Sequence, residues 1–249
     1  MDALSAALAT EGFWFLAIGA FLAGLVRGFA GFGTGLIFMP VASQVLPPVW
    51  AIVVMITLDL FGPIPAVPRA LRDGHPRDLL PLGIGCVIGT PVGLFLLLNM
   101  GEDVFRYAIS IVAFGLLILL IGGFRYRGPV GPKMLTTTGG LAGLFGGSVG
   151  VAGPPAILLY MARDLPVSVI RANTLVFLLI TDICLIFFFG LQGLLALSPI
   201  LLGVLLVPIY MAAIWLGTAI FDPGRAVVYR WVAYAIIGAS ALGGLPIWD

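Results

Sequence analysis

The chain alternates long apolar stretches with short polar segments. A transmembrane helix needs about 20 predominantly apolar residues. Six stretches have this length and predict membrane spans at 49–68, 79–98, 103–123, 172–191, 198–220 and 228–247. The pattern therefore predicts an all-α polytopic membrane protein that is surrounded by the lipid bilayer.

The composition narrows the class further. Of the 249 residues, 61% are hydrophobic and only 9% are charged, whereas soluble domains carry about 25% charged residues. So little charge cannot cover a surface that faces water. A soluble enzyme and a nucleic-acid-binding protein are both excluded on this ground, and the net charge of +1 gives no sign of a polyanionic partner.

Two further apolar regions, 13–46 and 134–162, are interrupted by runs of small residues. The first contains Arg27-Gly-Phe-Ala-Gly-Phe-Gly-Thr-Gly35, and the second contains Gly146-Gly-Ser-Val-Gly-Val-Ala-Gly-Pro-Pro155. Glycine and proline both disfavour a regular helix interior. Each region is therefore predicted to be a broken, re-entrant helical hairpin.

The two breaks share a spacing. Gly24-Leu-x-x-Gly28-x-x-Gly31 matches Gly143-Leu-x-x-Gly147-x-x-Gly150, and Asp59 and Asp182 each lie in the apolar run that follows a break. Ordered agreement of this kind along both halves indicates an internal repeat. We expect two repeats in one transmembrane domain, residues 1–125 and 126–249, each with one hairpin and three spans.

The basic residues predict the topology. If each broken region were a single crossing, they would divide six to five between the two sides. If each broken region returns to its starting side, only Arg106 lies opposite the others and Arg27 lies at a break. The ten that then share one side are Arg69, Arg72, Arg77, Arg125, Arg127, Lys133, Arg163, Arg171, Arg225 and Arg230.

The positive-inside rule favours the second arrangement. It places both termini outside the cytoplasm, which is the periplasm for a bacterial inner-membrane protein. An odd number of crossings in each half makes the two repeats inverted. Inverted repeats with broken helices are common in secondary transporters, whose substrate sites lie between the repeats.

The breaks are the predicted substrate site. Irregular backbone at membrane depth must be buried in protein or line a cavity, and a helix that restarts there presents N–H groups suited to an anion. Plain close packing of helices through small residues is the alternative. Asn173 and Thr174 follow the second break and are candidates for the wall of the substrate site. Their alternative role is to cap the helix that begins there. The other candidates at the breaks are Gly28, Gly31, Gly33, Thr34, Ser148, Gly150 and Gly153.

Three ionisable residues lie within apolar runs, where charge is costly. Arg27 is a candidate counter-charge for an anionic substrate, unless it snorkels to the interface or pairs with an intramembrane aspartate. Asp59 and Asp182 are candidates for coupling transport to a proton or cation. Their alternative role is structural, through contacts with helix-end N–H groups or with Arg27.

No cofactor or metal site is expected. Cys86 and Cys184 lie singly in apolar runs without metal-ligand spacing, and the one histidine, His75, lies in a charged loop. Motifs of intramembrane enzymes are also lacking, so we expect a protein that is not an enzyme.

The motifs Gly24–Gly35, Gly143–Pro155 and Arg171-Ala-Asn-Thr174 resemble those of the TauE/SafE sulfite exporter family, also called the toluene sulfonyl uptake permease family. The resemblance covers essentially the whole chain. It implies an inner-membrane transporter of a small sulfur-containing anion, sulfite or an organosulfonate such as sulfoacetate, and leaves uptake or export open. We expect an ion-coupled alternating-access mechanism. A passive anion channel, or a membrane subunit of a larger complex, is the alternative, and a homodimer is compatible with either.

Overall fold

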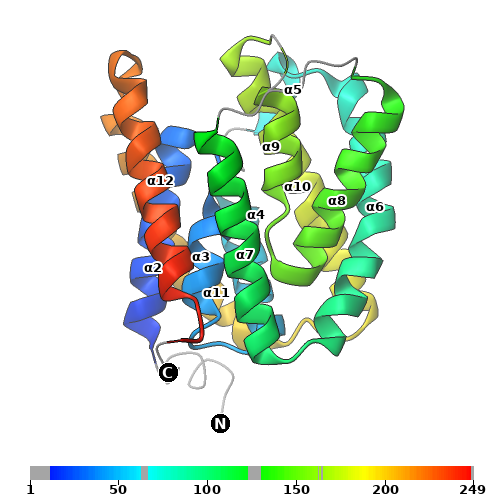
Figure 1. Cartoon of the computed structure of the whole chain (residues 1–249), viewed down its shortest axis with the longest axis vertical. Helices are drawn as coiled ribbons and strands as arrows, with labels where there is room; N and C mark the ends of the chain where they lie inside the picture. Colours follow the sequence, from blue (N-terminus) through cyan, green and yellow to red (C-terminus); the bar gives the residue numbers. More distant parts are fainter. Residues whose placement is uncertain (1–11, 63–66, 123–129, 162, 164, 248–249) are drawn as a thin grey trace.

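A computed structural model of the chain describes residues 12–62, 67–122, 130–161, 163 and 165–247. Every regular element in these residues is helical (Figure 1). The α-helices are α2 (Phe13–Ala30), α3 (Thr34–Ala42), α4 (Pro48–Phe61), α5 (Val67–Asp73), α6 (Pro76–Asn99), α7 (Glu102–Ile121), α8 (Pro132–Val149), α9 (Gly153–Met161), α10 (Val167–Leu191), α11 (Leu197–Ile220) and α12 (Ala226–Gly243). A short 3-10 turn, Pro223–Arg225, precedes α12.

Helix length and composition agree with a multi-pass membrane protein. Within the described residues, α2, α6, α7, α10 and α11 contain windows long and apolar enough to cross a membrane. The helices α4 and α12 are apolar but shorter. The predicted span 49–68 corresponds to α4, a helix of only 14 residues that ends at Phe61. Positions 63–66 of this predicted span lie outside the described part of the chain.

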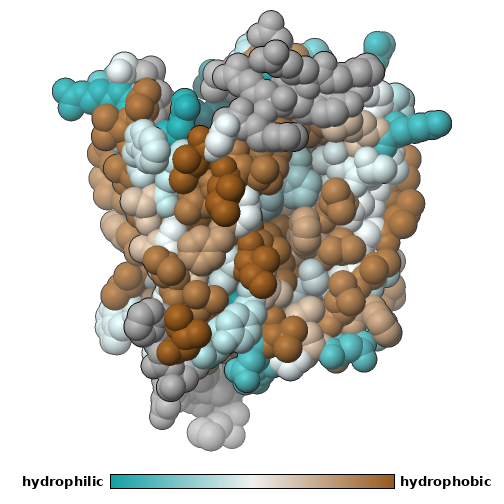
Figure 2. Space-filling model, viewed as in Figure 1, coloured by the Kyte–Doolittle hydropathy of each residue, from teal (hydrophilic) through white to brown (hydrophobic). Residues whose placement is uncertain are grey.

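Large apolar side chains face outward around the molecule. Trp14 is 77% exposed, Ile118 69% and Trp215 74%. Figure 2 shows hydrophobic residues spread over the middle of the face in view, with most of the hydrophilic residues gathered toward its two ends. This distribution is the one that a lipid bilayer stabilises, because its core cannot solvate polar side chains.

Glycines in the left-handed conformation end the first helix of each broken region. Gly31 closes α2 at φ 83°, and Gly150 closes α8 at φ 72°. Residues with a Cβ rarely adopt these angles. After each break the chain forms a helix of only nine residues, α3 or α9, which packs back against α2 or α8. The breaks therefore lie close to the middle of each region, between α2 and α3 and between α8 and α9.

Backbone-to-backbone packing through glycine joins helices from the two halves of the sequence. A Cβ at Gly139 of α8 would lie 2.0 Å from the Leu82 carbonyl oxygen of α6. In the same way, a Cβ at Gly217 of α11 would lie 2.2 Å from the Leu25 carbonyl oxygen of α2. Small residues permit this close approach in membranes. The long helix of each broken region is thus held by a helix from the other half.

The helix ends place several of the basic residues at one end of the bundle. In Figure 1, α2 begins and α12 ends toward the lower end, whereas α5 and the start of α12 lie at the upper end. The segment α5 carries Arg69 and Arg72, and the turn before α12 carries Arg225. The first turns of α10, which include Arg171, pack against α5. We call this the arginine-rich end.

Candidate functional site

A buried hydrogen-bonded network lies beside the first break. Arg27, in the last turn of α2, donates from Nη1 to Asp59 Oδ1 of α4 at 2.8 Å and to Thr34 Oγ1 at 2.9 Å. The hydroxyl of Tyr210, from α11, donates to Asp59 Oδ1 at 2.8 Å and lies 2.7 Å from Thr34 Oγ1. All four residues are buried, so the charges of Arg27 and Asp59 compensate each other away from water.

The break itself brings Thr34 to Arg27. Gly33 has φ +116°, a conformation that side chains rarely adopt, and it reverses the chain directly before α3. Thr34 is therefore the first residue of α3 and lies at the end where helix N–H groups have no intrahelical acceptor. The sequence pattern and the local backbone together explain why a hydroxyl meets a guanidinium here.

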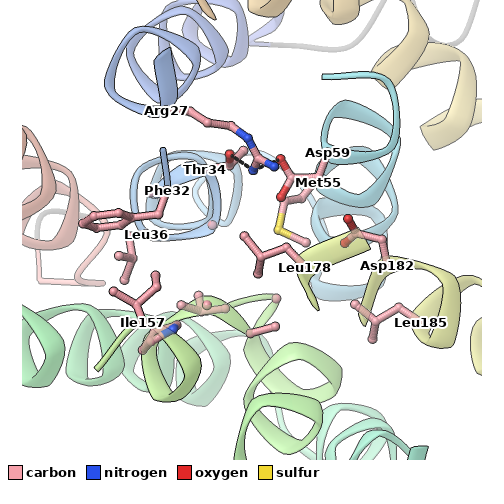
Figure 3. A pocket seen from close by; sticks show the side chains of 17 residues that line it. Arg27, Phe32, Thr34, Leu36, Met55, Asp59, Ile157, Leu178, Asp182 and Leu185 are labelled. Atoms are coloured by element: carbon pink, nitrogen blue, oxygen red, sulfur yellow. Dashed lines mark hydrogen bonds and ion pairs between the residues drawn. The ribbon is translucent and has the colours of Figure 1, made fainter. Parts of the chain in front are cut away.

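The second break forms the facing wall. Figure 3 shows a pocket between the two breaks, with Arg27, Thr34 and Asp59 on one side and Ile157 of α9 on the other. The volume is about 30 Å³, enough for a water molecule or two and too small for an organosulfonate. In this conformation the pocket is therefore too narrow for the proposed class of anion.

The two aspartates of the pocket differ in their partners. Asp59 accepts hydrogen bonds from Arg27 and Tyr210. Asp182, from α10, is 4% exposed, and its Oδ2 has no hydrogen-bond partner among the described residues. Figure 3 shows the Asp182 carboxylate near Met55 and Asp59 without an interaction drawn to it. Buried polar atoms of this kind are rare, and each calls for an explanation, such as a bound proton, water or ion.

Most of the residues that the sequence singles out converge on this pocket. They come from helices far apart in the sequence and from both breaks. The ones that line it are Arg27, Gly33, Thr34, Asp59, Gly150, Gly153 and Asp182.

The other candidates lie elsewhere. A Cβ at Gly28 would lie 2.4 Å from the Ile214 carbonyl oxygen, so this glycine packs α2 against α11. Ser148 donates within its own helix to the Leu144 carbonyl at 2.7 Å. Asn173 accepts a hydrogen bond from the backbone N–H of His75 at 2.7 Å and does not line the pocket.

Sequence reasoning missed Tyr210, which completes the network from α11. Its only signal is its place within the apolar helix Leu197–Ile220. A buried tyrosine hydroxyl usually needs a hydrogen-bond partner, but no pattern in the sequence says which one.

Two wider cavities lie next to the pocket. One, of about 270 Å³, is lined by Thr174 and by aromatic side chains, and it shares Phe32 and Ile157 with the narrow pocket. The other, of about 460 Å³, contains Arg27 and residues of α5. Gly31 and Arg171 line both cavities.

Comparison with known sequences places this chain in a protein family. A family model described as "Sulfite exporter TauE/SafE" matches residues 16–243. The chain is 27% identical over 229 residues to a protein of Cupriavidus necator named "Probable sulfite/organosulfonate exporter TauE", with 85% of this chain and 86% of that protein covered. No solved structure matches the chain.

Proposed function

We propose that this chain, which belongs to the sulfite exporter TauE/SafE family, is a secondary transporter that carries sulfite or an organosulfonate such as sulfoacetate across the bacterial inner membrane. Members of the family are exporters rather than enzymes. Transport of sulfur anions across a membrane follows from the family. The substrate, the coupling and the mechanism below are our proposal.

The convergence of the two breaks on one buried pocket carries the proposal. Arg27 supplies positive charge, and the first residue of α3, Thr34, supplies a hydroxyl beside it. Gly33, Gly150 and Gly153 have no side chains that would keep an oxyanion from the backbone. The restart of α3 adds free N–H groups, which favour negative charge. The restart of α9 adds fewer, because Pro154 and Pro155 follow Gly153 and proline has no N–H. We infer that the anion binds between the breaks when the pocket opens.

The charge balance of the pocket suggests how transport is coupled. Arg27 is already paired with Asp59, so an anion that takes over the guanidinium leaves Asp59 buried without its partner. Such an uncompensated buried charge is strongly unfavourable. A proton taken up at a carboxylate of the pocket together with the anion keeps the net charge of the pocket unchanged and so reduces this penalty. We assign that proton to Asp182, whose Oδ2 has no described partner, and we assign to Asp59 the role of releasing Arg27.

Alternating access is proposed to arise from two inverted repeats, residues 1–125 and 126–249. The packing of α8 on α6 and of α2 on α11 supports this, because each broken region is held by the other repeat. The pocket of about 30 Å³ must widen before an organosulfonate can bind, which a movement of one repeat against the other would allow. We place both termini in the periplasm, since Arg69, Arg72 and Arg225 lie at the opposite end of the bundle.

The test is flux of radiolabelled sulfite and sulfoacetate into proteoliposomes that hold the purified protein. We expect saturable uptake that an imposed pH gradient accelerates. Flux that rises linearly with concentration and ignores the gradient would instead identify a passive anion channel. Absence of flux for both anions, with intact protein in the vesicles, would contradict the proposed substrate class.

The coupling assignment has its own variant. Asp182→Asn is expected to lose the response to the pH gradient and to keep exchange of labelled for unlabelled anion, because exchange needs no net proton movement. The matched control is Asp103→Asn, which changes an exposed aspartate in the first turn of α7. An Asp182→Asn protein that still responds to the gradient would exclude Asp182 as the coupling residue.

A further inference from the structure

Arg171 does not line the pocket that contains Arg27, so the site described above gives it no role. It lies in the second turn of α10 and lines both of the wider cavities. Its Nη2 donates to the Phe29 carbonyl of α2 at 2.5 Å, and its guanidinium carbon lies 5.2 Å from the centroid of the Phe221 ring. An arginine has five N–H donors, so this contact leaves most of its hydrogen-bonding capacity for a ligand.

The larger cavity carries uncompensated positive charge at Arg171. Of the basic residues that line it, Arg27 is paired with Asp59, and Arg69 lies 3.4 Å from Asp73. Within the described residues, no carboxylate forms an ion pair with Arg171. A cleft with net charge of one sign concentrates ligands of the opposite sign.

The smaller cavity adds an apolar wall beside the same guanidinium. Phe29 and Phe221 line it, and Phe221 is in cation-π contact with Arg171. A ligand with an anionic head and a short organic tail fits this combination, with the head on the guanidinium and the tail on the rings. Arginine can bind an anionic group that presents two oxygen atoms through two parallel N–H bonds.

Gly31 connects the surroundings of Arg171 with the buried pocket that contains Arg27. Its N–H donates to the Arg27 carbonyl at 2.8 Å, and a Cβ added to it would lie 3.5 Å from Arg171 Nε. The same break therefore touches both arginines. The larger cavity extends from Arg69 of α5, at the arginine-rich end, to Arg27.

We infer that Arg171 forms a second anion site, a vestibule in which an organosulfonate binds from the arginine-rich end before it reaches Arg27. This inference rests on the proposed transport function and deepens it. The vestibule selects an organosulfonate over sulfite, because only the former has an organic group to place against Phe29 and Phe221.

The experiment measures KM for sulfoacetate and for sulfite on each face of the membrane, in sealed vesicles of both orientations. For Arg171→Gln we expect the KM for sulfoacetate to rise about ten-fold at the arginine-rich face, the scale of one lost charge-assisted hydrogen bond. We expect a smaller rise for sulfite and no rise at the opposite face. Arg171→Lys should recover part of the loss.

Arg225→Gln is the matched control. It removes an arginine from the same end that lines neither cavity. An unchanged KM in Arg171→Gln, with or without a fall in thermal stability, would overturn the vestibule and leave Arg171 as a cap of α2. A KM effect that vanishes in vesicles without anionic lipid would overturn it in favour of a lipid headgroup. If the wild-type protein shows no saturable flux at all, the proposed transport function fails instead.

Discussion

Replacing Arg27 by glutamine tests how much the buried ion pair with Asp59 contributes to the stability of the protein. The side chains of Arg27 and Asp59 are each 8% exposed, and their polar atoms lie 2.8 Å apart. Glutamine is shorter than arginine and carries no charge. Arg27→Gln therefore leaves Asp59 with the Tyr210 hydroxyl as its remaining described hydrogen-bond donor.

The expected loss follows from that isolation. Removing one partner of a buried ion pair costs about 3–5 kcal/mol, because the other charge remains desolvated. The single substitution Asp59→Asn should cost a similar amount, since it isolates the guanidinium instead. The double substitution removes both charges, so its cost should be well below the sum of the two single costs.

The measurement is the free energy of unfolding of the purified protein in mixed detergent micelles, followed by tryptophan fluorescence. Wild type, the two single variants and the double variant form one cycle. Arg225→Gln serves as control. Its exposed pair with Asp222, at 3.7 Å, should contribute within about 0.5 kcal/mol.

Two results would refute this reasoning. A cost below about 1 kcal/mol for Arg27→Gln would mean that Asp59 is not desolvated in the membrane protein. Strict additivity of the two single substitutions would mean that they do not interact. The double variant should also be inactive in transport although it is stable, because it lacks the proposed counter-charge.

Three further outcomes are expected. Gly89→Ala should lower the free energy of unfolding by about 1–3 kcal/mol, because its Cβ would lie 2.0 Å from a carbonyl oxygen of α8. Gly115→Ala, within α7, which has nothing within 4 Å, should not lower it, and thermal denaturation compares the two. Tyr210→Phe should cost about 1–3 kcal/mol in the same assay, because it leaves buried acceptors of the network unsatisfied. Cysteines placed at Arg72 and Arg225 should react with an impermeant thiol reagent from the same face of sealed vesicles, and reaction from opposite faces would contradict the proposed topology.

The membrane-protein class and the positions of the breaks were predictable from the sequence, because apolar length and clustered glycine act locally. Gly31, Gly33 and Gly150 do adopt left-handed angles where the chain leaves its helices. Glycines with other roles look the same in the sequence. Gly28 lies within the same motif as Gly31, yet a Cβ on Gly28 would lie 2.4 Å from a carbonyl oxygen of α11, whereas a Cβ on Gly31 would meet nothing closer than 3.5 Å. Only the packing of distant helices separates these roles.

The network itself was only partly predictable. A contact between Arg27 and an intramembrane aspartate follows from the cost of burying charge, and pairing with Asp59 is one of the alternatives that the sequence leaves open. Tyr210 is 151 residues from Asp59, and no periodicity connects the two. Asn173 was expected on the site wall because it follows the second break. Instead it joins α10 to the backbone of His75, a contact fixed by how α10 packs beside α5.

The internal repeat that we propose offers a reason why the two aspartates of the pocket are not equivalent. Asp59 and Asp182 occupy corresponding places in the two halves, but the position that corresponds to Arg27 in the second half is Gly146. A Cβ at Gly146 would lie 3.0 Å from the Ala152 Cβ, so no side chain as large as arginine fits there. The pocket therefore has two carboxylates and one guanidinium. Asp59 takes the guanidinium, and Asp182 is left for the proton that we propose accompanies an incoming anion.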